Sequence, residues 1–474
     1  MKIAEFLEEG LEDNTTYDSE ELAKLDLNGK KTNFASRGKE FLKFISKELN
    51  KKLLDENFRK SNLITFGEEF EFADDLYFLK VRLNSEDYSF ANLNIQTGNV
   101  IGKINSNYDD YSYTLKIKSR FGNQFFQYLL AYAEGFLELE DLGAYSEEND
   151  LYWALIYLWK SKLKQAYRSG LPKLYETKQK ELNKIKGGLN LKEQFKKPYD
   201  NGQYHCQYRE HSYDNQVTRI IAYTFNLLFK KHQKLLSDVF RLKNVFNQVC
   251  NQPKISLEDL EQVNLSNPYY RDYREVLELS KKIIKQEAIS IRSSDADFSG
   301  FLFDISLLFE HHIRKLIKEE ITEIKMWDKT ELKMNSGGRT RKLIPDIIIE
   351  KDNDLFVYDV KYKKFKTRVK REDMFQIVTY AAKLASRNDY NLKGCGFIYP
   401  HGYKNEENKK DIISEELNLF TELDFNILFY EIPQDKECTK EEDYTLDFKG
   451  FKETMGENNK KFIDDLSATL NLSK

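Results

Sequence analysis

Three charged residues stand at a spacing that suits metal-dependent hydrolysis of a phosphodiester. Asp346 follows Pro345 in a short apolar run, and Asp359 and Lys361 are separated by one residue in the next apolar run. Magnesium prefers oxygen ligands and is commonly held by one or two carboxylates together with substrate phosphate. A lysine beside them can orient the attacking water or stabilise the charge that develops on phosphate. The residue types and their spacing therefore predict a metal-dependent nuclease site.

Two predicted strands bring these residues together. Segments 343–349 and 355–362 are short, apolar and rich in β-branched or aromatic residues, and the polar residues between them have the composition of a turn. Side chains alternate between the two faces of a strand, so Asp359 and Lys361 are expected on one face, and the hairpin returns Asp346 to them. Two carboxylates in an apolar place repel each other, and a divalent cation offsets that cost. From spacing alone, a turn aspartate and a solvent-facing ion pair remain the alternative.

Two predicted helices flank the strands, and each contributes a polar candidate. In segment 301–317, apolar residues lie three, four and seven positions from Glu310, so this carboxylate is either a core acid or part of the metal site. The helix expected from about 372 to 384 places Gln376 and Tyr380 on one face. Gln376 could hydrogen-bond a water or a phosphate near the metal, or could be an exposed helix amide.

The charge distribution adds a prediction about DNA. The net charge of −4 argues against a uniformly basic nucleic-acid binder. Residues 151–200 hold twelve Lys or Arg against four Asp or Glu, which suits either a solvated surface or phosphate contact. A second basic run follows the Asp-x-Lys pair directly. From this run we expect contact with the DNA backbone by Lys363, Lys364, Lys366 and Arg368.

Other features exclude whole classes of protein. The four Cys are scattered without a C-x-x-C pair, which gives no disulfide framework or zinc site. The chain has no apolar run of transmembrane length and no signal-peptide pattern at its start, so a cytoplasmic protein that contacts no membrane is expected. Residues 97–104 imitate a P-loop but have the wrong glycine spacing and no Ser or Thr after Lys103. His311 and His312 are adjacent, cannot share a helix face as a ligand pair, and are expected at the helix surface.

The remaining pattern indicates an α+β or α/β chain of two or three domains. Segment 61–120 is rich in short alternating runs typical of strands, and a strand is also expected at 203–210. The C-terminal part has the predicted order α, β, β, α, β, β, with its last two strands near 394–399 and 425–430. Helices are expected at about 37–54, 125–137, 151–167, 173–186, 216–246 and 273–288, and a junction at 292–297.

These residues resemble the McrC family, the nuclease subunit of the McrBC modification-dependent restriction systems. Segments 344–346 and 358–363 resemble its PD-(D/E)xK nuclease core, and segments 301–310 and 376–381 resemble the helices on either side. N-terminal family patterns are similar to segments 119–123, 170–175 and 182–187. The resemblance covers about residues 90 to 430.

The resemblance implies that the chain has two domains with different functions. Residues 1–290 would be a mixed β-rich and helical domain that docks on and activates a hexameric AAA+ GTPase ring of McrB type, which binds the GTP and recognises DNA carrying a 5-methylcytosine-type modification. Residues 291–474 would be a PD-(D/E)xK endonuclease, a mixed sheet flanked by helices, that cuts double-stranded DNA in a prokaryotic cytoplasm.

The resemblance also assigns roles within the nuclease site. Asp346 and Asp359 would bind Mg²⁺ with the carbonyl of Val360, and Glu310 would complete or support the metal shell. Lys361 would position the water, and Gln376 would contact phosphate or support the site. Arg120 and Arg219 are the candidates for reaching the partner's GTPase centre.

Two rival functions stay open at this stage. In one, the chain is a self-sufficient endonuclease whose N-terminal half binds DNA. In the other, it is a non-catalytic adaptor and activator of a AAA+ ring with a vestigial nuclease fold.

Overall fold

The computed structural model describes a large part of the chain. It describes residues 2–5, 11–18, 63–66, 79–83, 93–108, 111–133, 152–196, 202–250, 255, 260, 262–291, 298–328, 332–336, 339–365, 367–387, 389–402, 412–418, 422–433 and 448–472. The predicted helix at 37–54, the junction at 292–297 and Lys366 lie outside these ranges. Within the described ranges, no helix combines the length and apolarity needed to span a membrane.

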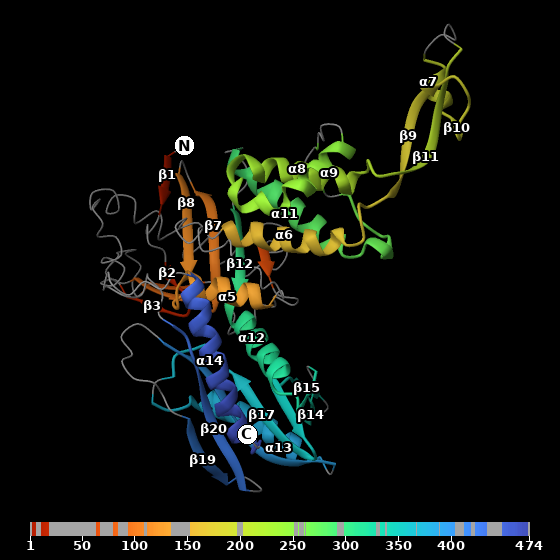
Figure 1. The fold of residues 1–474 in the computed structure, drawn as a ribbon. Coiled ribbons are helices and arrows are strands. Elements are labelled where there is room, and N and C mark those ends of the chain that lie inside the picture. Colours follow the sequence, from red (N-terminus) through yellow and green to blue (C-terminus); the bar gives the residue numbers. More distant parts are fainter. Residues whose placement is uncertain are drawn as a thin grey trace. The chain divides into compact units, whose positions relative to one another are not determined.

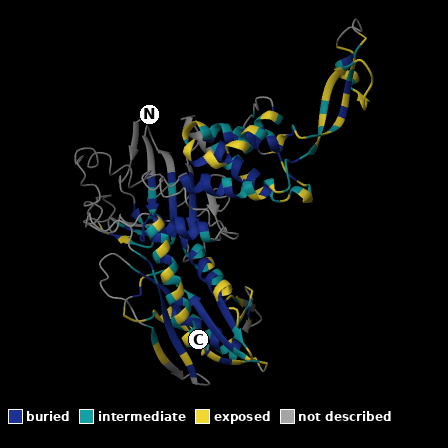
Figure 2. Cartoon of the chain, viewed as in Figure 1, coloured by how far each residue is buried: buried dark blue, intermediate teal, exposed yellow. Residues whose placement is uncertain are grey.

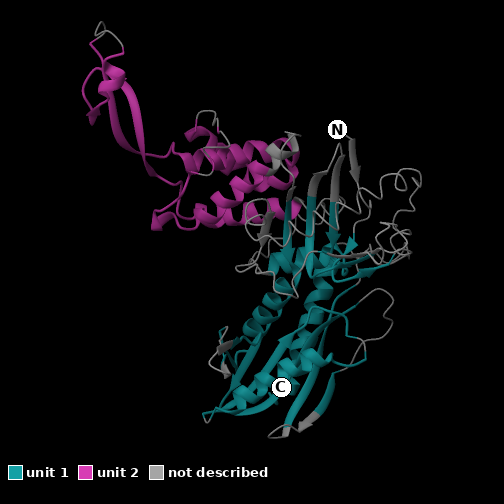
Figure 3. Cartoon of the chain, turned by 180° about the vertical axis from the view of Figure 1, so that it is seen from behind, with its two compact units in different colours: residues 1–149, 300–474 teal, residues 150–299 magenta. Residues whose placement is uncertain are grey.

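Contacts divide the chain into two compact units (Figure 3). One unit is residues 150–299, and the other joins residues 1–149 to residues 300–474. This grouping differs from the predicted division after residue 290. The reason is the strand at the boundary, β12 (Phe298–Asp304), whose residues from Gly300 onward pair in parallel with β4 (Leu63–Phe66) and so tie the last part of the chain to the first.

The middle unit is a group of packed helices with a β-ribbon (Figure 1). Helix α11 (Tyr273–Ile291) packs against α6 (Tyr152–Tyr167) and α8 (Gln216–Lys231), and α9 (Phe240–Val249) packs against α8. The ribbon consists of β9 (Leu174–Leu182), β10 (Gly188–Leu189) and β11 (Tyr204–Ser212), with the short α7 (Leu191–Gln194) near its end. In Figure 2 most of the ribbon is exposed or intermediate, whereas the helices bury their facing sides.

The predicted helix at 173–186 is therefore wrong, because β9 occupies this segment. Each residue of β9 pairs with one of β11, from Leu174 opposite Ser212 to Leu182 opposite Tyr204. A cross-strand ion pair of 2.7 Å between Lys178 and Glu210 stabilises the ribbon. The lysine-rich composition of 173–186 favours a helix locally, but pairing with a strand thirty residues away overrides that preference. The strand predicted at 203–210 is confirmed by β11.

The larger unit contains a first sheet in the order β1-β8-β7-β12-β4, with β2 also paired to β8. A smaller sheet has the order β3-β6-β5, and α5 packs against α12 beside the first sheet. The bounds are β1 (Lys2–Glu5), β2 (Leu11–Glu12), β3 (Thr16–Tyr17), β5 (Leu79–Leu83), β6 (Leu93–Thr97), β7 (Val100–Tyr108), β8 (Tyr111–Lys118), α5 (Asn123–Ala133) and α12 (Ile305–Glu320). The predicted β-rich character of 61–120 is confirmed in the described part of that segment.

The predicted helix over 301–317 is correct only from residue 305. Residues 301–304 belong to β12, and the side chain of Asp304 caps α12 by accepting a 3.0 Å hydrogen bond from the Leu307 N–H. An unbroken apolar run reads equally as a buried strand or a buried helix, so periodicity alone did not place this boundary. The strand lies close to its sheet neighbour β7: a Cβ on Gly300 would lie 2.3 Å from the Lys103 carbonyl oxygen.

The second large sheet carries the predicted nuclease residues. Its order is β13-β16-β17-β18-β20-β19, with β17, β18 and β20 parallel and the other neighbours antiparallel. The bounds are β13 (Lys325–Met326), β16 (Ile347–Lys351), β17 (Asp354–Val360), β18 (Asn391–His401), β19 (Ile413–Asn418) and β20 (Glu422–Glu431). This confirms the mixed sheet flanked by helices, including the strands expected near 394–399 and 425–430.

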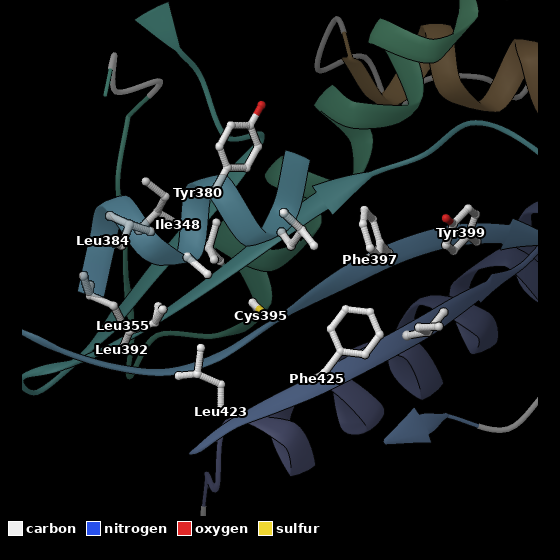
Figure 4. Close-up of a cluster of buried hydrophobic side chains, with 14 of the residues drawn as sticks. Ile348, Leu355, Tyr380, Leu384, Leu392, Cys395, Phe397, Tyr399, Leu423 and Phe425 are labelled. Atoms are coloured by element: carbon white, nitrogen blue, oxygen red, sulfur yellow. The ribbon is translucent and has the colours of Figure 1, made fainter. Parts of the chain in front are cut away.

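Helix α13 (Arg371–Ala385) covers one face of this sheet, and the side chains between the helix and the sheet form a hydrophobic core (Figure 4). Ile377, Tyr380 and Leu384 of the helix pack on strand residues such as Leu355 and Val357. A hairpin of β14 (Leu332–Ser336) and β15 (Arg339–Leu343) adds Leu332 and Leu343 to the same core. The face that α13 covers is the face on which Asp359 lies, because strand side chains alternate.

Helices α12 and α14 (Phe448–Thr469) lie on the opposite face (Figure 1). A buried polar chain links them: the ring Nε2 of His312 lies 2.7 Å from the Tyr430 hydroxyl, which donates a 2.6 Å hydrogen bond to Asn459. The surface position predicted for His312 is wrong, since its side chain is fully buried, whereas His311 is exposed. Burial lowers the pKa of His312 to about 3, so this histidine is a neutral core residue.

Candidate functional site

The two aspartates meet where neighbouring antiparallel strands come together. Ile347 pairs with Tyr358, so Asp346, which directly precedes β16, faces the end of β17. The backbone N–H of Val360 donates a 2.8 Å hydrogen bond to the Asp346 carboxylate. The strand predicted over 343–349 is in fact interrupted: β15 ends before Pro345 and β16 begins after Asp346. Because of this break, Asp346 is half-buried just before the first residue of β16 and is not part of the strand pairing.

Lys361 is held from three sides just beyond β17. Its ammonium lies 2.6 Å from the Asp359 carboxylate and donates a 2.7 Å hydrogen bond to Oε1 of Gln376. Its backbone N–H donates to the Ile398 carbonyl at 2.9 Å. Asp359 and Lys361 thus lie on one face, as the strand alternation predicts. The solvent-facing alternative does not describe them, since the Asp359 side chain is 1% exposed and the Lys361 side chain 18%.

Helix α13 supplies the support for this lysine. The amide nitrogen of Gln376 donates a 2.8 Å hydrogen bond to the Tyr380 hydroxyl, which in turn donates to the Ile344 carbonyl at 3.3 Å. The shared helix face predicted for Gln376 and Tyr380 is confirmed, and the exposed-amide alternative is wrong. Lys361, Gln376 and Tyr380 form one hydrogen-bonded row that fixes the position of the ammonium group.

The electrostatics of the cluster disfavour two bare charged carboxylates. Burial, then the charges of Asp359 and Glu310, raises the pKa of Asp346 well above its usual value. Burial also raises the pKa of Asp359, against the lowering effect of Lys361. Burial opposes the charge on Lys361, but Asp359 more than offsets this and the pKa of Lys361 is raised. The site therefore combines a fixed cation with two carboxylates whose charged forms a further positive charge would stabilise.

This donor set fits a magnesium-type ion held by two carboxylates. Asp346 and Asp359 converge with raised pKa values, which is the electrostatic situation that a divalent cation relieves. Within the described ranges, no three or more His, Cys, Asp or Glu side chains gather tightly enough to form a metal centre by themselves. The charge of Glu310 raises the pKa of both aspartates, but Glu310 does not form a three-carboxylate group with them in the described part of the chain.

The basic residues predicted to contact DNA have different surroundings. Lys363 pairs with the carboxylate of Asp373 in α13, and burial lowers the pKa of this lysine. Lys364 and Arg368 are exposed. Lys366 lies outside the described residues. Asp373, which also lies 3.8 Å from the Lys361 ammonium, was missed at the sequence level because an acid in the first turn of a helix is an ordinary helix-capping feature.

Arg120 occupies a structural position beside the site. Its guanidinium donates a 2.8 Å hydrogen bond to the Tyr362 carbonyl and lies 4.4 Å from the centre of the Tyr362 ring. Its backbone N–H donates to the buried Asp13 carboxylate at 2.8 Å, and the side chain of Asn14 donates to the same Tyr362 carbonyl at 3.2 Å. Arg120 is 7% exposed, so it is not placed to reach another protein's GTPase centre.

The other arginine candidate also has an internal partner. The side chain of Arg219 forms a 2.7 Å ion pair with Asp214 at the start of α8, and this side chain is 38% exposed. The structure thus leaves Arg219 partly accessible, whereas Arg120 holds the residue that follows Lys361.

The fold and the site define a mixed α/β protein with a carboxylate–lysine cluster at the ends of its sheet strands. A family model described as McrBC 5-methylcytosine restriction system component matches residues 95–400, which is more than half of the chain. The chain therefore belongs to the McrBC 5-methylcytosine restriction system component family.

Two solved structures are similar to the chain. In a refined half-complex from the tetradecameric assembly of Thermococcus gammatolerans McrB AAA+ hexamers with bound McrC, the matched chain is 16% identical with a TM-score of 0.49, covering 96% of this chain and 100% of that chain. In the cryo-EM structure of the Thermococcus gammatolerans McrBC complex, the matched chain is 18% identical with a TM-score of 0.34. The match covers 67% of this chain and 87% of that chain. No curated protein matches the chain.

Proposed function

We propose that this chain is the nuclease component of a McrBC-type restriction complex, and that it hydrolyses DNA phosphodiester bonds with Mg²⁺ held at Asp346 and Asp359. The observation that carries the proposal is the convergence of these two carboxylates with Lys361 at the strand ends. Its support is chemical: a metal-dependent nuclease needs paired acids and a cation beside the scissile phosphate, and a component of a restriction system needs a way to cut DNA.

The residues of the chain have separable tasks in this reaction. When bound, the divalent ion would supply Lewis acidity at the phosphate, held by the two aspartates and the Val360 carbonyl. The Lys361 ammonium, fixed by Gln376, orients the attacking water and stabilises the negative charge that grows on the phosphate oxygens. The Val360 N–H holds the Asp346 carboxylate in one orientation.

The proposal is tested with the purified chain, a McrB-type GTPase partner, methylated duplex DNA, Mg²⁺ and GTP. Asp359→Ala is expected to lose DNA cleavage and to keep its stimulation of GTP turnover, which serves as the control for folding and docking. If Asp359→Ala still cuts, the nuclease site lies elsewhere. Cleavage by the wild-type chain alone, without partner or GTP, would instead support the self-sufficient endonuclease.

We further infer that the ribbon of the middle unit contacts the GTPase partner. Its far end carries large apolar side chains on the surface, among them Ile185, Leu191 and Phe195, the last of which is 73% exposed. Exposed apolar groups on a narrow extension bury little against their own chain, and they suit insertion into a partner. This would be the part of the chain that docks on a AAA+ ring.

Phe195→Ser is expected to lower the stimulation of the partner's GTPase about tenfold. An aromatic side chain that becomes buried on binding typically carries a large share of the binding free energy of an interface. GTP turnover is measured against the concentration of the chain. Tyr269→Ser is the matched control, since Tyr269 is 69% exposed in the same unit but lies off the ribbon, in a short 3-10 helix (Pro268–Tyr270). Equal effects of the two changes would contradict the ribbon assignment.

A further inference from the structure

A cavity of about 540 Å³ lies beside the carboxylate–lysine cluster in the larger unit. One side is the basic loop after β17, with Lys363, Lys364, Arg368 and Lys370 in its lining. The other side comes from the N-terminal segment 12–16 and from Gln96 of β6. The two sides belong to parts of the chain that lie more than 250 residues apart in sequence, so the cavity exists only in the folded unit.

The lining is strongly biased toward positive charge and hydrogen-bond donors. Five lining side chains are Lys or Arg, and Glu12 is the one lining carboxylate among the residues that the structure describes. Lys363 and Arg120 also pair with Asp373 and Asp13, so Lys364, Arg368 and Lys370 carry the positive charge that a ligand would meet. The opposite wall adds polar groups from Asn14, Thr15 and Thr16. Hydroxyls, amides and ammonium groups facing one space form the donor set that phosphate oxygens accept from.

Arg120 connects this cavity to the nuclease site. Arg120 is among the lining residues, and its guanidinium donates to the carbonyl of Tyr362, the residue after Lys361. The side chain is held on both sides, by the Tyr362 ring at 4.4 Å and by the Asp13 carboxylate at 3.8 Å. A phosphate in the cavity would therefore lie along the same stretch of backbone that positions the proposed catalytic lysine.

We propose that this cavity binds a backbone phosphate of the DNA substrate, and that the N-terminal segment 12–16 forms one wall of the DNA-binding surface. The inference rests on the proposed nuclease function and deepens it. It assigns DNA contact to Thr15, Thr16 and Lys370, residues on both sides of the cavity. DNA seating would then depend on the N-terminal strands as well as on the nuclease sheet.

The test uses opposite charges at one exposed position. Thr16 is exposed in β3, so both Thr16→Glu and Thr16→Lys are compatible with folding. The full chain is titrated into a fluorescein-labelled DNA duplex in EDTA, which separates binding from cleavage. Thr16→Glu is expected to weaken binding about fivefold and Thr16→Lys to strengthen it, because each changes one charge beside a phosphate. Lys393→Glu, an exposed change on β18 that does not line the cavity, should leave binding unchanged.

A second measurement identifies the source of the phosphate. Lys364→Gln is expected to reduce the salt dependence of DNA binding by about one unit of slope, as the loss of one phosphate contact does. Inorganic phosphate is titrated calorimetrically into the same variants. If the Thr16 changes alter binding of inorganic phosphate but not of DNA, the cavity takes a small anion and the proposal is overturned.

Two other outcomes overturn it as well: equal affinities of Thr16→Glu and Thr16→Lys for DNA, or no binding of DNA by the wild-type chain at low salt. Failure here is distinguishable from failure of the proposed nuclease function. The Asp359→Ala comparison reads cleavage, whereas these titrations read binding without cleavage.

Discussion

Asp346→Asn is expected to lower DNA cleavage on the order of 10²- to 10³-fold and, without divalent metal, to raise the melting temperature of the chain by about 2 °C. The cleavage loss follows from removing one of two carboxylates that would hold the ion. The stability gain follows from the surroundings of Asp346: burial, then the charges of Asp359 and Glu310, raises its pKa, so its charged form is disfavoured in the folded chain. Asparagine keeps an oxygen that can accept the Val360 N–H and removes the repelling charge.

Thermal unfolding with EDTA and with Mg²⁺ checks both halves of this prediction. Magnesium should raise the melting temperature of the wild-type chain and have little effect on Asp346→Asn, since ligand binding stabilises only a form that binds. Asp424→Asn is the matched control, because Asp424 is exposed on β20 in the same sheet. Undiminished cleavage by Asp346→Asn would contradict its role in holding the ion, and a melting temperature that falls would show that its carboxylate stabilises the fold.

The hairpin of the candidate site could be predicted because its information is local. Alternation along β17 places Asp359 and Lys361 on one face, and a short polar turn is enough to return the chain to Asp346. The spacing of Gln376 and Tyr380 within one helix is equally local. In these cases the sequence distance between the partners is small, or the element that carries them is regular, so the pattern decides the geometry.

The errors have the opposite cause, which is pairing over long sequence distances. Segment 173–186 has a helical composition, but most of it forms a strand that pairs with β11. Residues 301–303 are apolar enough for a helix, but they pair with β4, more than 230 residues earlier. The sequence predicts a surface position for His312 because its partners, Tyr430 and Tyr128, come from elements far away along the chain. A single sequence carries no signal for such contacts.

Arg120 shows how this limit affects function. Its only sequence signal is its place in a segment that resembles a family pattern, which makes it a candidate for reaching the partner's GTPase centre. The structure instead places it in the interior, against Asp13 and Tyr362. A buried arginine that binds the backbone next to the proposed catalytic lysine acts within its own chain.

Arg120→Met is accordingly expected to destabilise the chain by about 3 kcal/mol and to impair cleavage in the assembled complex. Methionine keeps much of the packing volume but leaves the Tyr362 carbonyl without the 2.8 Å hydrogen bond from this side chain, and it leaves the Asp13 carboxylate without its nearest cation. Chemical denaturation measures the free energy of unfolding, and single-turnover cleavage measures the effect on the site. A variant as stable and as active as the wild type would contradict the assignment.

The loss of stability should depend on pH in a specific direction. Burial raises the pKa of Asp13 to about 6 despite the lowering effect of Arg120, so the folded wild-type chain binds this proton more tightly than the unfolded chain does. Its contribution to stability therefore falls as pH rises from about 4 to about 6. Without Arg120 the pKa of Asp13 rises further, so the contribution of Asp13 to stability continues to fall up to a higher pH. Arg120→Met should thus cost more stability at pH 8 than at pH 5.

A double-mutant cycle separates the ion pair from the other contacts of Arg120. Asp13→Asn removes the buried charge and keeps an oxygen that can accept from the Arg120 backbone N–H. In this background the pH dependence of the Arg120→Met effect should disappear, and the remaining loss should reflect the hydrogen bond to the Tyr362 carbonyl and the packing on its ring. If cleavage still falls in the double variant while stability recovers, Arg120 positions the backbone beside Lys361 independently of its role in stability.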